Sequence, residues 1–465
     1  MNNRLLSILL FGLGLFCACK KNSFITSPGA QVSFSSDTLY FDTVFTSAGS
    51  ITQQVKIYNQ NNQKINLSQI QLMGGSGSAF KININGAAVS QTTNVEIDAN
   101  DSIYIFVSVY VNPTAANLPF IVQDSILVSF NGNQKFIQLQ AYGQNANFLQ
   151  NMEIIGQATW SAKLPYVITG GILVDSGATL TIQAGCKIYL HQNAAFIVNG
   201  SLQIQGQPVD SARVYFQGDR LDLPYANYPG SWPGIFFNAS SRDNLLSAVV
   251  ISNAYQGVIA SGPSPDNQPK LTLDECILNN IYDAGILATQ SSITARNCLV
   301  SNCGRNIVLT YGGNYSFTYC TVASYSNMYI SHSQPVLALD DSIASGNGSS
   351  SNLNASFLNC IYWGADGTVT DEVAAYPQNG PVFNVTFNNS LWKLTNIPPV
   401  SYNNMLNVDP LFDSVNTQTG YYDFHLQPAS PAAGYGALVP SIPYDLDGNP
   451  RSVGNKTSLG CYQVQ

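Results

Sequence analysis

The stretches Cys276-Ile277-Leu278-Asn279-Asn280, Cys298-Leu299-Val300-Ser301-Asn302 and Cys320-Thr321-Val322-Ala323-Ser324 begin at steps of 22 residues. Each starts with a cysteine, continues as a short strand-like run and ends in a polar turn. A second apolar run follows, such as Ile286-Leu287 or Ile307-Val308-Leu309. Three short strands in about 22 residues predict one turn of a coil that stacks on the next at about 4.8 Å. The repeat therefore predicts a right-handed parallel β-helix.

The same period extends in both directions. Ile172–Val174 and Phe196–Val198 lie 24 residues apart, and Thr179–Ile182 precedes Ser201–Ile204 by 22. Ser342-Ile343-Ala344 follows Cys320 by 22 residues, and Cys360 comes 18 residues later, which predicts a shortened coil. We expect the β-helix to occupy residues 146–394.

The cysteines of the repeat predict a column inside the coil. Cysteine is small, apolar and often buried, so Cys276, Cys298 and Cys320 are expected to stack as core residues. Disulfides between neighbouring coils stay open, because adjacent strands lie within disulfide range. A metal site is disfavoured because the three histidines lie elsewhere in the sequence. Asn280 and Asn302 are expected to form an asparagine ladder, since asparagine tolerates the left-handed conformation of tight turns.

Residues 30–145 have a different pattern, in which short strands alternate apolar and polar residues between Asn- and Gly-rich turns. Such spacing indicates an antiparallel β-sandwich. The expected strands are Val32–Phe34, Thr38–Phe41, Thr52–Tyr58, Phe80–Ile84, Asn94–Ile97, Ser102–Val111, Asp124–Phe130 and Lys135–Gln140. The pattern from "FDTVFTSAGSITQQVKIYNQ" to "IQLQAYG" resembles the Ig-like domains of the ASPM/SPD-2/Hydin type, which implies a spacer or docking module.

The first 19 residues have the features of a bacterial lipoprotein leader. Arg4 supplies a positive charge, Leu5 to Phe16 form a short apolar segment, and Ala18 precedes Cys19. A membrane span would need about 20 apolar residues, so this segment is a signal rather than a span. Ala18-Cys19 resembles a lipobox, although Phe16-Cys17 departs from its small residues; an ordinary signal peptide is the alternative. The resemblance implies lipidation at Cys19, with residues 20–29 as a linker. Lys20 then favours the outer membrane, on its periplasmic face or at the cell surface.

Residues 395–465 are expected to continue the β-helix and cap it. The segments Asp409-Pro410-Leu411-Phe412, Asp423-Phe424-His425-Leu426, Ser430-Pro431-Ala432 and Asp445-Leu446-Asp447-Gly448-Asn449-Pro450-Arg451 resemble the C-terminal region of bacterial β-helix proteins. Because a solenoid leaves strand edges unpaired, such a segment is expected to cover them. Asp445–Asn449 is read as a structural turn, since it lacks the further ligands of a calcium loop. The fold class is thus all-β: an Ig-like sandwich, then a β-helix with a C-terminal cap.

Composition restricts the partners. Only 9% of the residues are charged, and the net charge of −8 disfavours nucleic acid, whose phosphates need a basic surface. Together, the repeat and the terminal pattern resemble the right-handed β-helix lipoproteins of Bacteroidetes-type bacteria. The resemblance implies a pectate-lyase-like fold, which hosts polysaccharide lyases and glycoside hydrolases as well as proteins of other functions, so the fold does not give the activity.

Candidate catalytic groups are few. Hydrolysis of a glycosidic bond needs two carboxylates that face one groove, and Asp340 with Asp341 is the nearest such pair. On a 22-residue grid Asp274, Arg296, Thr318 and Asp340 fall in one column, which is either a row that contacts a ligand or a solvated turn row with one ion pair. The second reading is favoured. No metal or other cofactor is expected.

The insertion Gly218–Trp232 lengthens one coil and contains the candidate ligand-binding residues Arg220, Asp222, Tyr225, Tyr228 and Trp232. Aromatic rings stack on sugars while arginine and aspartate bind hydroxyls, so the loop suits a glycan; the alternative is that its aromatics pack the loop onto the coil. The sequence favours a membrane-anchored, non-catalytic scaffold that binds polysaccharide or a surface protein. A polysaccharide lyase or glycoside hydrolase is the alternative.

Overall fold

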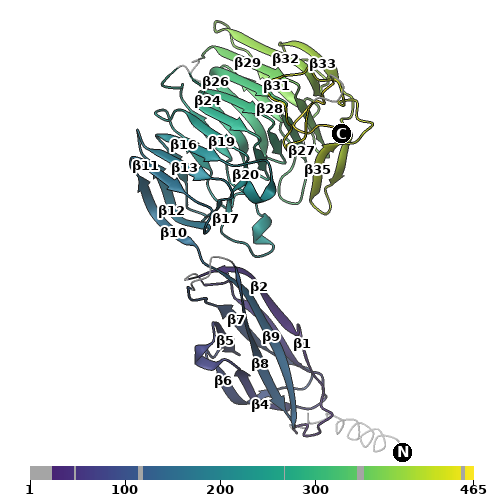
Figure 1. Cartoon of the computed structure of the whole chain (residues 1–465). Helices are drawn as coiled ribbons and strands as arrows, with labels where there is room; N and C mark the ends of the chain where they lie inside the picture. The colour runs from purple at the N-terminus through teal and green to yellow at the C-terminus, as the bar shows by residue number, and fades with distance from the viewer. Residues whose placement is uncertain (1–22, 47–48, 114–118, 267, 343–349, 452–455) are drawn as a thin grey trace, which may run out of the picture. The chain divides into compact units, whose positions relative to one another are not determined.

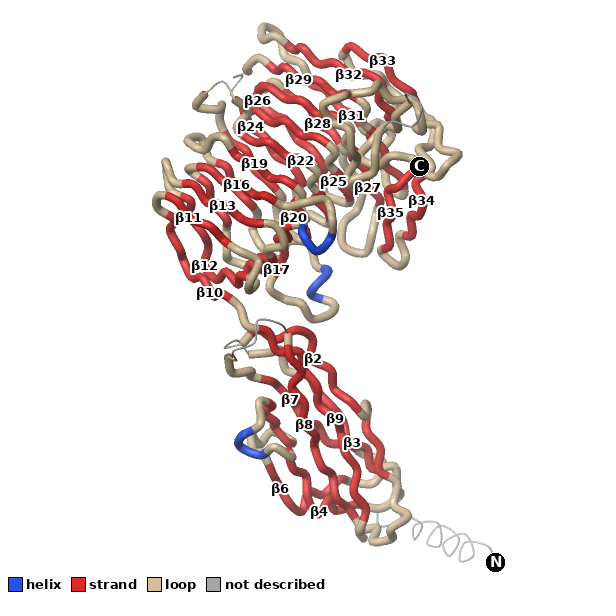
Figure 2. Tube along the Cα trace, viewed as in Figure 1, coloured by secondary structure: helices blue, strands red, loops and turns tan. Residues whose placement is uncertain are grey.

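The computed structural model describes residues 23–46, 49–113, 119–266, 268–342, 350–451 and 456–465. The expected leader, with Cys19, and the segment 343–349 lie outside this part of the chain. The protein divides into two compact units, Met1–Asn145 and Ala146–Gln465 (Figure 1). Nearly all of the regular structure in both units is β-strand, as Figure 2 shows by colour.

The first unit is a sandwich of a four-stranded and a five-stranded sheet around one apolar core. The first sheet has the order β1 (Val32–Phe34), β3 (Gln53–Asn59), β7 (Ser102–Val109) and β5 (Phe80–Ile84). The second has the order β2 (Thr38–Phe45), β9 (Asn133–Gln144), β8 (Phe120–Phe130), β4 (Ile65–Leu72) and β6 (Gln91–Ile97). Gly75–Gly77 forms the short helix η2.

Two features of this sandwich differ from the expectation. The edge strand β2 pairs with β9 in parallel, so the sheet is not wholly antiparallel. Strand β4 was not predicted, because its buried residues shift phase between Leu67 and Ile70 and break the alternation of a regular strand. The turn Asn131-Gly132, with φ of 46° and 81°, joins β8 to β9 as a tight two-residue hairpin.

The second unit is the parallel β-helix, with a continuous sheet system of 24 strands, β10 to β33. Each coil contributes one strand to each of three faces, here called A, B and C in chain order. Face A holds parts of β10 (Asn147–Ile154), β12 (Tyr166–Val174), β24 (Ala284–Arg296) and β26 (Arg305–Thr318), with β15 (Phe196–Val198), β18 (Ile235–Phe237), β21 (Val258–Ser261), β28 (Leu337–Asp340) and β31 (Val373–Tyr376).

The remaining strands form the other two faces. Face B holds β11 (Gln157–Trp160), β13 (Thr179–Gln183), β16 (Ser201–Gln205), β19 (Asn244–Ser247), β22 (Leu271–Asp274), the second halves of β24 and β26, β29 (Leu353–Leu358), β32 (Phe383–Trp392) and β33 (Ser401–Leu406). Face C holds the first halves of β10 and β12, then β14 (Lys187–Leu190), β17 (Val214–Gly218), β20 (Val249–Ser252), β23 (Ile277–Asn279), β25 (Leu299–Ser301), β27 (Thr321–Tyr325) and β30 (Ile361–Ala365), and the ends of β32 and β33. Two short helices, η3 (Asp210–Ala212) and η4 (Tyr225–Asn227), lie in connecting loops.

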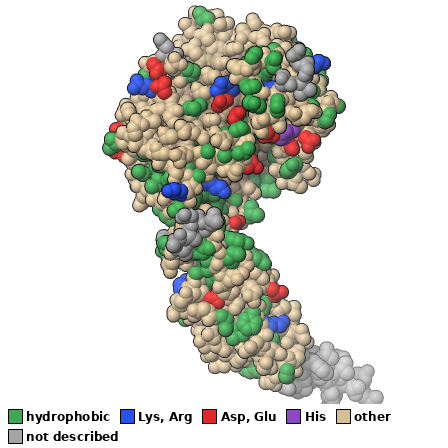
Figure 3. Space-filling view, in the orientation of Figure 1, with side chains coloured by type: hydrophobic (Ala, Val, Ile, Leu, Met, Phe, Trp, Pro, Cys, Tyr) green, Lys and Arg blue, Asp and Glu red, His purple; other side chains and the backbone are tan. Residues whose placement is uncertain are grey.

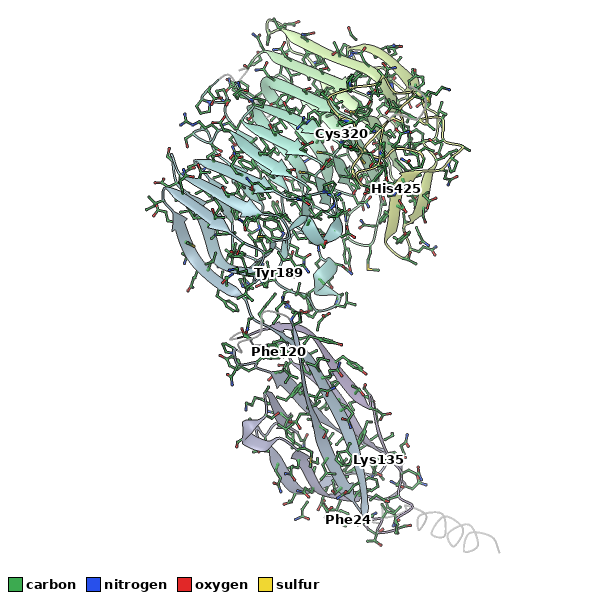
Figure 4. The ribbon with its side chains drawn as sticks, in the orientation of Figure 1. Phe24, Phe120, Lys135, Tyr189, Cys320 and His425 are labelled. Atoms are coloured by element: carbon green, nitrogen blue, oxygen red, sulfur yellow. The ribbon has the colours of Figure 1, made fainter. Side chains whose placement is uncertain are left out.

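The cysteine column is a core ladder. Cys276, Cys298, Cys320 and Cys360 are buried and free of disulfides, and Cys320 lies among the strands in Figure 4. Each thiol is within hydrogen-bonding distance of a carbonyl of the preceding coil; Cys276 Sγ lies 3.2 Å from Leu246 O. The residue before each cysteine has a positive φ, which turns the chain from face B to face C. These four coils therefore share the same corner, in which a bend is followed by a buried sulfur.

The coil after Cys320 is long rather than short. Strand β27 pairs directly with β30, so Cys360 occupies the next position of the column, 40 residues after Cys320. Ser342 lies instead in a bridge with Ser350, at the corner between faces A and B. Ser342 therefore does not begin the next coil of the column, which corrects that part of the prediction; Ile343 and Ala344 lie outside the described residues.

The described part of the C-terminal segment, residues 407–451 and 456–465, packs beside face C. It contains the hairpin of β34 (Phe412–Asn416) and β35 (Tyr421–Leu426), and its apolar residues form a second core with Leu299, Ala323 and Ile361. Arg451 is fully buried here: its guanidinium donates to Asn297 Oδ1 at 2.6 Å and lies 3.8 Å from the ring centroid of Tyr319. Arg451 of the DLDGNPR motif thus links the C-terminal segment to two successive coils, through Asn297 and Tyr319.

Candidate functional site

A pocket of about 380 Å³ lies in the second unit, where three parts of the chain meet over the turn that follows face C. Its floor is that turn, one side is the Gly218–Trp232 insertion, and the other is formed by the loop after β27 and the tip of the β34–β35 hairpin. We call it the asparagine pocket, because six asparagines line it together with Met328, Tyr329, Tyr422 and residues 417–420; the six are Asn227, Asn253, Asn279, Asn280, Asn302 and Asn327.

The asparagines at the floor are fixed by the repeat. Asn253, Asn280 and Asn302 have φ of 61°, 56° and 51°, in the left-handed region that asparagine tolerates. Asn280 Nδ2 donates to Asn253 Oδ1 at 2.8 Å and to Asn227 O at 2.9 Å. Asn302 Oδ1 accepts from the backbone of Tyr325 at 3.2 Å. The ladder exists, but Asn280 bonds to the preceding coil rather than to Asn302.

Each of these two amides keeps one half free. Within the described residues, Asn280 Oδ1 and Asn302 Nδ2 have no hydrogen-bond partner. One is an acceptor and the other is a donor, and they stand on successive coils of the stack. A sugar hydroxyl both donates and accepts hydrogen bonds, so a pair of neighbouring hydroxyls matches this arrangement.

The insertion adds an aromatic and charged wall. Arg220 forms a bidentate pair with Asp222, at 2.7 and 2.8 Å, and its guanidinium lies 4.0 Å from the ring centroid of Tyr225. Hydrogen bonding to Arg220 lowers the pKa of Asp222. Tyr225 contacts Tyr228, and Tyr228 contacts Tyr329 of the pocket, each with ring centroids 5.2 Å apart. All three tyrosines remain substantially exposed.

Trp232 is not a surface residue. Its side chain is fully buried in the β-helix core, and its Nε1 donates to Ser252 O at 2.9 Å. The prediction that Trp232 binds a ligand was therefore wrong. The chain rejoins the coil at Trp232, and the buried indole anchors the end of the insertion in the core. Arg220, Asp222, Tyr225 and Tyr228 remain at the surface.

Asp274 and Arg296 form the single ion pair expected if their column is a solvated turn row, with Nη2 and Oδ2 2.7 Å apart on face B. Burial raises the pKa of Asp274. It also raises the pKa of the adjacent Glu275 to about 7. None of these three residues lines the asparagine pocket. The column continues through Thr318 to Leu358, so Asp340 does not belong to it.

Asp340 and Asp341 do not form a catalytic pair. Asp340 Oδ1 accepts from the backbone and the hydroxyl of Ser342, at 2.8 and 2.7 Å. Asp341 is fully buried, and both of its carboxylate oxygens accept from the backbone of Gln378. The two side chains therefore hold different turns, which corrects the expectation that they could face one groove.

The hairpin at the rim of the pocket is held by a histidine. His425, on β35 in Figure 4, lies between Asp423 at 2.5 Å and Asp447 at 2.8 Å, and its ring stacks on Tyr462. The bond to Asp447 is the main reason that the pKa of His425 rises to about 9. Because Asp447 belongs to the terminal turn, this contact joins the hairpin to the rest of the C-terminal segment.

His332 forms a buried pair with Glu372 that the sequence did not predict. His332 Nε2 lies 2.9 Å from Glu372 Oε1, with both side chains almost completely buried. The two residues come from loops 40 positions apart, and no motif or spacing predicts that they meet. Elsewhere in the described chain, no cluster of three or more His, Cys, Asp or Glu side chains could hold a metal ion. The described residues also include no helix long and apolar enough to cross a membrane.

Comparisons with known proteins give only weak likenesses. No family model and no curated protein matches the chain. A family 123 glycoside hydrolase from Clostridium perfringens, studied for glycolipid glycan hydrolysis, aligns at 11% identity and a TM-score of 0.19; 26% of this chain covers 30% of that protein. A PapD-like domain of human CEP192 aligns at 10% identity and a TM-score of 0.18, with 26% of this chain covering 89% of the domain.

Proposed function

We propose that this protein is an envelope lipoprotein of the Bacteroidetes-type β-helix kind, which binds a neutral glycan at the asparagine pocket without cleaving it. The observation that carries the proposal is the pocket's combination of free amide halves with the exposed ring of Tyr329, which Tyr228 and Tyr225 extend beside the pocket. Amides satisfy sugar hydroxyls, and aromatic rings cover the apolar faces of sugar rings.

The absence of charged side chains among the described lining residues of the pocket favours an uncharged ligand. The pocket lining consists of asparagine, glutamine, threonine, tyrosine, methionine and glycine. Among the described lining residues there is no aspartate, glutamate, histidine, lysine or arginine. The nearby Arg220 and Asp222 neutralise one another. An anionic glycan would need cationic partners, so a neutral glycan is the better fit.

A binding role without cleavage is supported by the state of the candidate carboxylates. Asp340 and Asp341 are occupied by separate turns, and Asp222 is occupied by Arg220. Glycoside hydrolysis needs two carboxyl groups free to face the same bond. These three are committed to other contacts.

The test is retention of residues 20–465 on a panel of neutral and anionic glycans. We expect retention on at least one neutral glycan, reduced at least tenfold by Tyr329→Ala. The matched control is Tyr376→Ala, because Tyr376 is similarly exposed in the same unit and does not line the pocket. Equal retention of the two variants, or retention on anionic glycans alone, would contradict the proposal.

The lipid anchor is a separate part of the proposal. It is supported by Ala18-Cys19 after a short apolar segment. Labelling of cells with a radioactive fatty acid should mark the wild-type chain and leave Cys19→Ala unmarked. Protease treatment of intact cells then separates the cell surface from the periplasmic face of the outer membrane.

A further inference from the structure

A second depression, of about 740 Å³, lies on face B and shares no lining residue with the asparagine pocket. It extends over β24, β26, β29 and β32, four strands in register. In Figure 3 the surface over this part of the β-helix is largely tan, the colour of uncharged polar side chains and backbone. We call it the face B groove.

Two rows of side chains form its floor. The first row is Ser292, Asn314, Asn354 and Asn384, which occupy equivalent positions on successive strands. Asn354 Nδ2 donates to Asn314 Oδ1 at 3.1 Å, so neighbouring members of the row are linked. Because parallel strands keep their register, this row repeats a polar group at about 4.8 Å along the stack.

The second row lies two positions along each strand and therefore on the same face. It consists of Thr294, Ser316, Ser356 and Thr386. The residues between the two rows, such as Ile293 and Val385, point into the core. Every side chain of both rows is thus a hydroxyl or an amide directed outward.

The corner of the groove contains an unsatisfied hydroxyl. Ser291 lines the groove and is only 2% exposed, and its Oγ has no partner within the described structure. Gly313 lies beside it in the next coil with φ of 119°, and a Cβ there would lie 2.4 Å from Ser291 O. Glycine therefore allows the two coils to pack closely at this corner. A buried hydroxyl without a partner is costly, so an unmet hydrogen-bonding demand lies beside the groove.

The ligand class follows from the charge and the shape. Asp266 is the only ionisable acid or base among the described lining residues, apart from the Tyr315 phenol, which donates to Gly312 O. Such a lining has no cations for phosphate, sulfate or uronate groups and too few carboxylates for a metal ion. Three steps between four strands give a length of roughly 14 Å. The groove fits an extended chain that carries many uncharged hydroxyls.

We propose that the face B groove is a second binding site, which holds a stretch of neutral polysaccharide across the strands and along the stack. The site stands on observations independent of the asparagine pocket. Two sites on one unit would bind a long chain more tightly than either alone, since the second contact becomes intramolecular.

The experiment is affinity electrophoresis of residues 20–465 in gels containing hydroxyethyl cellulose, galactomannan or polygalacturonate. Ser316→Arg and Ser356→Arg place a bulky charge in the middle of the groove. The control is Thr181→Arg, which changes an outward threonine of the same face four strands away, outside the groove. Thermal unfolding shows whether each variant is folded, and Ser316→Ala with Ser356→Ala serves as a milder pair.

We expect the groove variants to raise the dissociation constant for a neutral polysaccharide at least fivefold relative to Thr181→Arg. Equal retention of groove and control variants, retention on polygalacturonate alone, or no retention on either neutral polymer would overturn the proposal. The two sites are distinguishable: loss with Tyr329→Ala only supports the asparagine pocket and rejects the groove, and loss with the groove variants only does the reverse.

Discussion

Tyr228 and Tyr329 meet edge to face, with ring centroids 5.2 Å apart and ring planes at 63°. The first belongs to the Gly218–Trp232 insertion and the second to the long coil between Cys320 and Cys360. This contact joins the two loops that border the asparagine pocket. The aromatic wall is therefore a product of two insertions and not of the repeat itself.

The contact predicts energetic coupling in ligand binding. Because Tyr228 supports the ring of Tyr329, Tyr228→Ala should weaken glycan binding although Tyr228 is outside the pocket lining. A double-mutant cycle on the dissociation constant should give a coupling of about 1 kcal/mol, as aromatic pairs commonly do. Strictly additive effects would show that the two rings act independently.

Arg451→Ala should destabilise the second unit by on the order of 3 kcal/mol, because it leaves buried acceptors of Asn297, Gly460 and Cys461 without their donor. Urea unfolding measures the change. Arg242→Ala is the matched control, since Arg242 is exposed and should stay within about 0.5 kcal/mol of the wild type. A similar stability for the two variants would mean that Arg451 does not fasten the C-terminal segment.

Stability should depend on pH through His425. Its pKa rises from 6.5 to about 9 in the folded chain, so the contribution of the Asp423–His425–Asp447 contact is complete below pH 6.5. It should be lost as the pH rises through 9. The stability difference between the wild type and His425→Gln, measured by urea unfolding from pH 6 to 10, should shrink over that interval. A constant difference would contradict the assignment.

The seven described cysteines should resist thiol reagents in the native state. All seven side chains are buried, which keeps reagents away from the sulfur atoms. Burial also raises the pKa of Cys186 to about 11 and the pKa of Cys303 and Cys461 to about 12, so these three carry little reactive thiolate. Residues 20–465 should show almost no reaction with a thiol-specific dye when folded and seven thiols in guanidinium chloride. Fewer than seven thiols in the denatured, unreduced protein would show that disulfides form.

Much of the fold was predictable because a stacked coil repeats its own sequence. The column of Cys276, Cys298 and Cys320 has like residues on like, and the spacing of Thr179 and Ser201 is the register of the sheet. Prediction failed where an insertion interrupts the repeat. The 40 residues from Cys320 to Cys360 contain a run that imitates a coil, and only pairing of β27 with β30 distinguishes the two.

The candidate site was predictable only in part. Arg220, Tyr225 and Tyr228 stand out because the insertion has an unusual composition, but the burial of Trp232 depends on where the loop rejoins the coil. The pocket joins Asn227, Asn280, Tyr329 and Gly420, which no sequence spacing relates. The face B groove was missed because its serines, threonines and asparagines are ordinary residues until the register aligns them in rows.

The protein is expected to bind a neutral glycan and to release it unchanged. The most direct measurement is mass spectrometry of a neutral oligosaccharide that residues 20–465 retain, after overnight incubation with the folded protein and elution by denaturation. We predict recovery of the intact oligosaccharide in an amount that falls with Tyr329→Ala. Recovery of shortened or unsaturated products, absent from a boiled control, would show that the protein cleaves the glycan and is an enzyme.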